Sequence, residues 1–476
     1  MNAGGMAPAL LAEVVERAGE TDLGAEAVTF GGADPVLPTR FRLGEMGAAT
    51  IAAAALAAAK LWQLRGGDTQ AIHVEVDAAA AALRSSRYMR PAIDAAPAGP
   101  RRGGGLGIYP TRDGRWMYFQ RLFPHHRERL FRVLGCADDE SAIARAVSDW
   151  EGLALEEAVV AAGATAGLVR TEAEWAQHPQ GLALATLPLL EILRVGDAPA
   201  QALPAGTRPL AGVHVLDVTR VLAGPTCGRT LAEHGAEVLR IGTASLPDNE
   251  AMMQDTGHGK RSAALDLNSA LGTATLRQLI RGADVFSQGY RPGSLAARGF
   301  SAEEIIALRP GIVHISISAF GHQGPWAERR GFDSVVQAAS GLADASAHDG
   351  VPRFLPANPL DYATGYLAAF GAMVALARRE HSGGSWLVRL SLAQTGRWLA
   401  SLPRIDTAQA AASAGDLPAE RLAELMTETD TPFGRLRHLK PAAQMAQTPP
   451  HWDLPTAPLA HDAPAWLGQP APPAAA

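Results

Sequence analysis

Asp361 is the residue best placed for covalent chemistry in this sequence. It lies in the stretch Leu360-Asp361-Tyr362-Ala363-Thr364-Gly365, which opens an Ala-rich apolar helix. A carboxylate can act as a nucleophile that forms an anhydride and then a thioester, which a hydroxyl cannot do symmetrically. The alternative is an aspartate that only caps the start of the helix. Asp361 is therefore a candidate nucleophile, and its helix must be positioned by the rest of the chain.

A second group of candidates is cationic. A site for a phosphate-bearing ligand needs several cations or backbone N–H donors around the end of an open sheet. Side chains of this kind occur at or beyond the ends of the predicted strands, at Arg220, Lys260, Arg261, Arg291 and Arg298. Taken singly, each could equally be a solvated surface charge.

The elements after Gly212 predict a parallel sheet with crossover helices. Short β-branched runs alternate there with helical stretches. The predicted strands are 213–217, 237–241, 284–286 and 312–316, and helices are expected near 228–234 and 270–280. The fold class we predict is α/β, with a Rossmann-like doubly wound parallel sheet and a smaller α+β domain. The fingerprint G-x-G-x-x-G is missing from the first turn, which argues against a dinucleotide cofactor.

Two Pro/Gly-rich stretches, 95–107 and 196–209, divide the chain. Before the first of them, an Ala/Leu-rich helix over 47–64 precedes an alternating strand over 72–76. The second block combines the strand-like run 116–119 with helices around 127–134 and 141–162. We predict four parts: a helix-strand segment (1–94), a small α+β domain (106–195), the Rossmann-like domain with Asp361 (210–400) and an irregular Pro-rich extension (401–476).

One internal similarity relates the first part to the third. The helix, Gly-Gly break and alternating strand of residues 43–77 recur at 360–394. Aligning the Gly-Gly pairs places Gly44 opposite Asp361, with Glu45 beside it. The earlier copy has either lost the carboxylate or shifted it by one residue. Chance likeness of two Ala-rich helices is the alternative.

Composition excludes several classes of function. With 47% hydrophobic and 19% charged residues, the chain is typical of a globular protein rather than a disordered one. A net charge of −6 gives no support to nucleic-acid binding. No signal peptide is evident, and the most apolar stretch, 48–59, is too short to span a membrane. Cys136 and Cys227 lack metal-ligand spacing, and His125-His126 has no carboxylate or Cys partner near it, so no metal is expected. We predict a cytoplasmic protein.

Several ordered motifs resemble the signature of the family III CoA transferases, the CaiB/BaiF type, which share a fold with formyl-CoA transferase and the alpha-methylacyl-CoA racemases. The motifs are Val215 to Pro225, Gly259 to Leu267, Gly289 to Gly293, Phe320 to Pro325, Gly331-Phe332-Asp333, Gln337 to Gly341, and Asp361 before its helix. The resemblance implies that Asp361 is the nucleophile and that Arg220, Val221, Leu222, Ala223, Lys260, Arg291 and Arg298 line the CoA site, with Arg261 beside them. It implies acyl-CoA and a carboxylic acid as substrates, no prosthetic group, and a homodimer that could be interlocked.

The first half resembles a later part of the same family's chain. Asp113-Gly114-Arg115-Trp116 and the run from Val169 to Trp175 are similar to signals of the family's small domain. The chain thus resembles one transferase module joined to a degenerate part of another. A departure follows the second predicted strand, where Arg240-Ile241-Gly242-Thr243 replaces the usual acidic residue followed by Pro or a base. Arg240 is therefore not a candidate for the ligand site.

Two other functions stay open. Racemases of this fold use a His and Asp pair, but the position of the His holds Phe332, which cannot exchange a proton. A base could still come from His314, His322 or His348. The degenerate first half also leaves a noncatalytic CoA-binding protein as an alternative.

Overall fold

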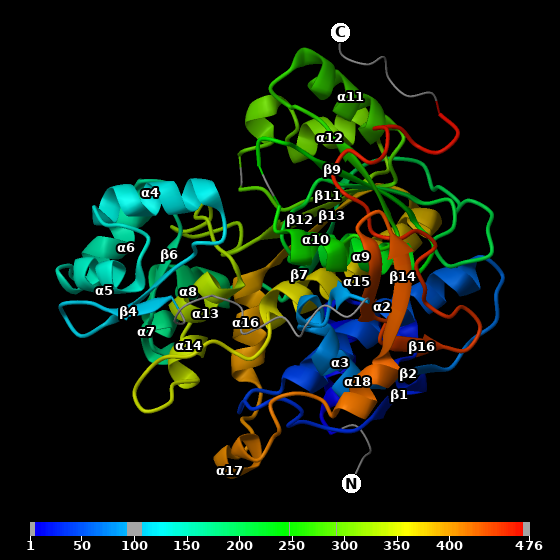
Figure 1. Ribbon diagram of the computed structural model, residues 1–476. Coiled ribbons are helices and arrows are strands. Elements are labelled where there is room, and N and C mark those ends of the chain that lie inside the picture. The colour runs from blue at the N-terminus through cyan, green and yellow to red at the C-terminus, as the bar shows by residue number, and fades with distance from the viewer. Residues whose placement is uncertain (1–4, 93–106, 247, 292, 470–476) are drawn as a thin grey trace.

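The computed structural model describes residues 5–92, 107–246, 248–291 and 293–469 (Figure 1). A seven-stranded sheet forms its centre, in the order β10-β9-β8-β11-β12-β13-β7. Its strands are β7 (Leu190–Gly196), β8 (His214–Asp217), β9 (Glu237–Gly242), β10 (Lys260–Ala264), β11 (Val285–Gln288), β12 (Val313–Ser318) and β13 (Ser385–Ser391). All but β7 run parallel. The chain runs outward from β8 in one direction and from β11 in the other, which is the predicted doubly wound order.

Alternate residues of the central strands face two different helix layers. Val215 and Val285 pack in one hydrophobic cluster with α9 (Ala223–Glu233) and α15 (Pro359–Ser382). Leu216 and Phe286 pack in another with α11 (Ala270–Arg281) and α12 (Ala302–Leu308). This is the period of two that a strand imposes. Figure 1 shows α11 and α12 above the sheet and α9 and α15 below it. The helices of this part are α9 (Ala223–Glu233), α10 (Glu250–Thr256), α11 (Ala270–Arg281), α12 (Ala302–Leu308), α15 (Pro359–Ser382) and α16 (Leu392–Ser401).

The pattern that recurs at residues 43–77 and 360–394 forms the same kind of unit in both places, a long helix followed by a parallel strand. Helix α2 (Leu43–Leu64) connects the parallel strands β1 (Val28–Gly31) and β2 (Ile72–Glu75), as α15 connects β12 and β13. Helices α2 and α15 pack directly against each other.

Both of these helices are long and apolar enough to cross a membrane, and most of each is buried inside the protein. Their length alone therefore does not indicate a membrane span. We call the N-terminal part of the chain up to residue 92 the first module; it also contains α1 (Ala7–Arg17), α3 (Val76–Ala82) and the short helix η3 (Ser85–Arg87). The Rossmann-like part that contains α15 is the second module.

The small domain has its own sheet and core. Strands β4 (Ile108–Pro110), β5 (Trp116–Phe119) and β6 (Ala166–Leu168) pack on α4 (Pro124–Leu134), α5 (Glu140–Ser148) and α6 (Gly152–Ala161). Four short helices connect it to the large sheet: α7 (Glu172–Gln177), α8 (Pro179–Ala185), α13 (Asp333–Ala339) and α14 (Leu342–Ala345). Strand β7 lies largely within the range that we predicted for the small domain, but it joins the large sheet.

Residues 401–476, which we expected to be irregular, contain regular elements. These are α17 (Thr407–Ala411), α18 (Ala419–Leu425), β14 (Met426–Thr431), β15 (Gly434–Leu439) and β16 (Ala443–Met445). Strands β14 and β15 form a hairpin that β3 (Arg90–Pro91) extends, and β16 joins β2. Beyond β16 the chain follows the edge strand β10, where Asp462 bonds to both backbone groups of Ser262, and Trp466 is buried. The prediction failed because it weighed the prolines near the terminus over the alternating run before them.

Candidate active site

A cavity of about 330 Å³ lies at the carboxyl ends of β8, β11 and β12. The strand order reverses between β8 and β11, and ligands of doubly wound sheets bind at such a point. The large domain supplies the turns after these strands, a loop at 327–332 and the start of α15, while the small domain supplies His125, His126 and Arg129. Both domains of one chain therefore line the cavity.

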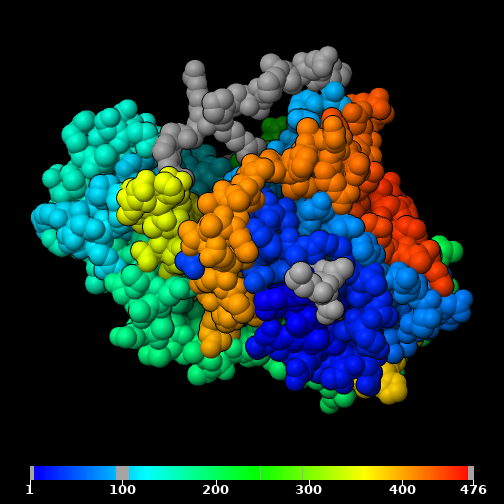
Figure 2. All heavy atoms as spheres, turned by 90° about the horizontal axis from the view of Figure 1, so that it is seen from below, coloured from blue at the N-terminus to red at the C-terminus, as the bar shows by residue number. Residues whose placement is uncertain are grey.

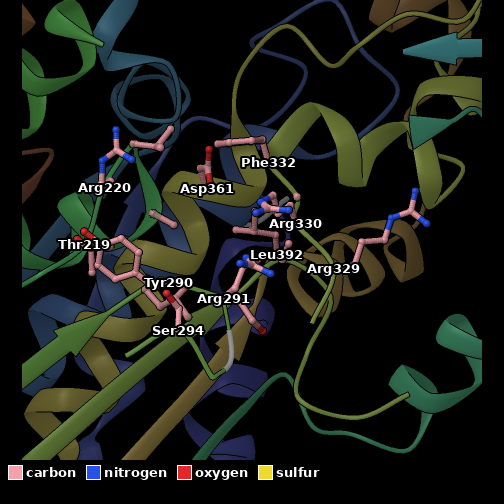
Figure 3. Close-up of a pocket in the computed structure, with 18 of the residues that line it drawn as sticks. Thr219, Arg220, Tyr290, Arg291, Ser294, Arg329, Arg330, Phe332, Asp361 and Leu392 are labelled. Atoms are coloured by element: carbon pink, nitrogen blue, oxygen red, sulfur yellow. The ribbon is translucent and has the colours of Figure 1, made fainter. Parts of the chain in front are cut away.

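Asp361 lies in the wall of this cavity, in the first turn of α15 (Figure 3). Its side chain is 6% exposed, and among the described residues no hydrogen bond reaches its carboxylate. Burial raises the pKa of Asp361 well above the ordinary value, and the charge of Asp333 raises it further. Both effects favour the neutral acid over the carboxylate, and nucleophilic attack requires loss of that proton.

Asp333 fixes the turn that carries Asp361. One carboxylate oxygen accepts the N–H groups of Leu360 at 2.9 Å and of Asp361 at 3.0 Å, and the other accepts from Gln337. Burial raises the pKa of Asp333 to about 6. The sequence contains the motif Gly331-Phe332-Asp333, but nothing in the motif indicates that its last residue caps the helix of the candidate nucleophile.

The turn after β8 brings Arg220, Val221 and Ala223 to the cavity. Arg220 pairs with Asp248 at 3.3 Å and lies over the ring of Phe123 in the small domain. Val221 has φ of 72°, an unusual conformation for a β-branched residue. Leu222 is buried at the N-cap of α9, so it supports the turn and does not line the cavity.

Lys260 and Arg261 are not brought to the cavity. The Lys260 ammonium is buried between the Asp217 carboxylate (2.8 Å) and the Pro225 carbonyl (2.7 Å), beneath α9. Arg261 points the other way, because neighbouring residues of a strand alternate, and donates to Ala465 of the C-terminal segment. Instead they hold α9 and the C-terminal segment, and the ligand contact that the sequence analysis expects of both stays a prediction.

Arg291 lines the main cavity, and Arg298 lines a smaller one beside it, of about 140 Å³. The two cavities share four wall residues, Val218, Leu246, Tyr290 and Ser294. The smaller one lies over the ends of β9 and β10, where Gly242 and Thr243 contribute to its wall. The departure noted after the second strand therefore falls at the far end of a continuous site.

Cations that the sequence analysis missed face the same space. Arg330 lines the cavity, and its pKa is lowered by burial and by the charges of Arg291 and Arg129. Within the described residues, neither Arg291 nor Arg330 forms an ion pair with a carboxylate. Arg330 stands directly before the motif Gly331-Phe332-Asp333, so its place was a usable signal. Arg129 carried no signal, because its domain lies far away in the sequence.

The three histidines left open as a base do not line the cavity. His314 is buried in β12, His322 pairs with Glu191 outside the cavity, and His348 is exposed beside Asp349. The cavity contains instead His125 and His126. Burial lowers the pKa of His126 to about 3, and its Nδ1 lies 2.9 Å from the Thr165 hydroxyl. Among the described residues, no group of three His, Cys, Asp or Glu side chains could hold a metal ion.

Comparison of the sequence with models of known protein families gives a match over most of the chain. The model of CoA-transferase family III matches residues 17–203 and 210–421, which together make up most of the chain. The chain belongs to CoA-transferase family III. The two matched stretches divide near the second Pro/Gly-rich stretch, between the small domain and the Rossmann-like domain.

Relatives within CoA-transferase family III match parts of the chain. An acyl-CoA transferase of Gibberella moniliformis is 35% identical over 254 residues, 50% of this chain and 44% of that protein. Succinyl-CoA--D-citramalate CoA-transferase of Chloroflexus aurantiacus is 33% identical over 201 residues, 39% and 49% of the two chains. The chain spans about half the length of the curated relatives it matches, or less. A CaiB/BaiF family protein from Brucella suis is 25% identical, with a TM-score of 0.39 over 48% of this chain and 65% of its own.

Proposed function

We propose that this protein is an acyl-CoA:carboxylate CoA-transferase with Asp361 as nucleophile. The observation that carries the proposal is a buried carboxylate without a hydrogen-bonding partner among the described residues, facing a cavity rich in arginine. The family membership and the named CoA transferases among the relatives support it.

The proposed reaction has four balanced steps. The Asp361 carboxylate attacks the thioester carbonyl, the C–S bond breaks, and CoA leaves as thiolate while a mixed anhydride forms on Asp361. The thiolate attacks the Asp361 carbonyl and releases the donor acid. The acceptor carboxylate attacks the resulting aspartyl thioester, giving a second anhydride and thiolate. The thiolate then attacks the acceptor acyl group, which gives the new acyl-CoA and regenerates Asp361.

The CoA site that we propose combines the two cavities. Ala223 and Gly224, the first two residues of α9, line the main cavity, and the N–H groups of this helix end can stabilise negative charge on the ligand. Arg220, Arg291 and Arg330 supply cations for the diphosphate and the thiolate, and Arg298 serves the nucleotide end in the smaller cavity. In this arrangement Lys260 acts indirectly, by holding α9.

A cytoplasmic location and a homodimer complete the proposal. The family resemblance supports the dimer, although the cavity itself is built within one chain. Sedimentation of the purified protein across a range of concentrations tests the dimer directly.

Trapping the intermediate tests the mechanism. The protein is incubated with succinyl-CoA or acetyl-CoA, treated with hydroxylamine or borohydride, and digested for mass spectrometry. We expect the modification on Asp361 and none in the Asp361→Asn variant. Transfer by a protein whose Asp361 stays unmodified would sink the mechanism. CoA binding with neither transfer nor modification would instead identify a noncatalytic CoA-binding protein.

One observation favours a second candidate, a CoA-thioester racemase or isomerase. His125 and His126 line the same cavity as Asp361, so a ligand bound in this cavity would lie between histidine side chains and a carboxyl group. Deuterium incorporation at the α-carbon of a 2-methylacyl-CoA in D2O, without CoA exchange between acids, would select this function over transfer.

A further inference from the structure

The first module contacts the start of α15 through residues that do not line the cavity. The carbonyl of Leu83 accepts the N–H of Asn358, the N-cap of α15, at 3.1 Å. The N–H of Ser86 donates to the hydroxyl of Tyr362 at 3.2 Å. Two backbone groups from the degenerate half of the chain therefore bond to residues on either side of Asp361.

A buried polar network strengthens this contact. The Asp255 carboxylate accepts from the Ser85 hydroxyl at 2.5 Å and from the Tyr362 hydroxyl at 3.2 Å, and it pairs with Arg229 at 3.0 Å. Each of the side chains in this network, and Ser86 beside them, is at most 6% exposed. None of them lines the cavity, so the network has no direct route to the ligand.

The chemistry of the network goes beyond what packing requires. A phenylalanine could fill the space of Tyr362, whereas a buried hydroxyl, carboxylate and guanidinium are costly unless they bond to one another. Fully bonded networks of this kind fix one arrangement of the groups that they join. Here the group that is fixed is the first turn of α15.

The first turn of α15 is thus held from two sides. Asp333 of the second module binds the N–H groups of Leu360 and Asp361, and the first module binds Asn358 and Tyr362. Successive helix residues point about 100° apart, so a small rotation of this turn would move the Asp361 carboxylate away from the thioester. A misplacement of about 1 Å can reduce a rate about 100-fold.

We propose that Ser85, Ser86, Tyr362 and Asp255 are positioning residues for Asp361, and that the degenerate first module serves the active site by orienting its nucleophile. This inference rests on the proposed function. It gives the first module a role in catalysis without a substrate contact of its own.

The test compares Tyr362→Phe and Ser85→Ala with the wild type. We expect kcat for CoA transfer to fall about 10-fold to 100-fold, with KM for acyl-CoA and the Kd of CoA by calorimetry unchanged within about two-fold, because the ligand site is untouched. Tyr88→Phe is the matched control: it removes a buried tyrosine hydroxyl of the first module that, like that of Tyr362, donates to an aspartate, here Asp416, and it should leave kcat unchanged.

The outcomes separate the two proposals. A wild type that neither transfers CoA nor is modified at Asp361 contradicts the proposed function, and the inference falls with it. An active wild type whose kcat survives both substitutions contradicts the positioning role alone. So does a lower thermal midpoint in both variants without a change in kcat. If Tyr362→Phe does not fold, Ser85→Ala decides, since it removes one hydroxyl and leaves the packing intact.

Discussion

Helices α2 and α15 begin with the same kind of cap, but the carboxylates in their first turns have different surroundings. Glu45 and Asp361 are each the third residue of their helix, and in each case an earlier aspartate accepts the N–H groups of the second and third residues: Asp34 for α2, Asp333 for α15. By this cap, Glu45 is the counterpart of Asp361. The Gly-Gly alignment, which placed Gly44 there, was one residue out.

The two carboxylates differ in what surrounds them. Glu45 is fully buried, pairs with Arg42 at 2.8 Å and accepts the N–H of Met6 at 3.0 Å. Asp361 faces a cavity, and its oxygens have no such partner in the part of the chain that is described. A carboxylate at this helix position is therefore not enough for chemistry. The open cavity and the lack of a paired cation among the described residues distinguish Asp361, the proposed nucleophile, from Glu45.

The largest expected effect is that of Asp361→Asn. The amide keeps the shape of the side chain but cannot form an anhydride, so we expect kcat/KM for CoA transfer to fall about 10⁴-fold or more. Transfer is followed by chromatography of the CoA esters, and the Kd of CoA is measured in parallel to show that the site is intact. Retention of a tenth of the activity would remove Asp361 from the mechanism.

Arg330→Met should have the next largest effect. The side chain faces the cavity with no carboxylate partner among the described residues, so its charge is available to an anionic ligand. A hydrogen bond to a charged group contributes about 1.5–3 kcal/mol, which corresponds to about a 10-fold to 100-fold rise in KM for acyl-CoA. Arg435→Met, on the exposed β14-β15 hairpin, is the control and should change nothing. Equal effects of the two would point to overall charge rather than a site.

The sequence predicted the fold better than the site, for physical reasons that particular residues show. The β-branched runs placed β8, β9, β11 and β12 within about two residues, since buried parallel strands need such runs. Strand β10 was not predicted, because Lys260-Arg261-Ser262-Ala263-Ala264 lacks that pattern. The ligand contact expected of Lys260 stays a prediction, but its burial beside Asp217 shows that motif position does not reveal which way a strand side chain points. Arg129 reaches the cavity through domain docking, which no local pattern encodes.

The acid limb of the pH profile offers a finer test. Attack needs the ionised form of Asp361, whose pKa is raised by burial and by Asp333, so kcat/KM should rise about ten-fold per pH unit and level off once the pair is ionised. Asp333→Asn keeps an acceptor for the two N–H groups of α15 but removes the charge. We expect the limb to move to lower pH. An unchanged or higher midpoint would show that Asp333 does not act on Asp361 electrostatically.

Glu45→Gln should have the smallest effect on activity and an effect on stability that Asp361→Asn lacks. The substitution leaves Arg42 beside a neutral amide, and since Arg42 is itself partly exposed, we expect the free energy of unfolding to fall by about 1–2 kcal/mol. No change in kcat is expected, because Glu45 does not line the cavity. Replacing Asp361 breaks no comparable bond among the described residues, so its variant should be as stable as the wild type or more so. Urea unfolding of both variants beside their rates checks this crossed pattern. A Glu45→Gln protein of normal stability with a lower kcat would show that the first copy still takes part in the chemistry.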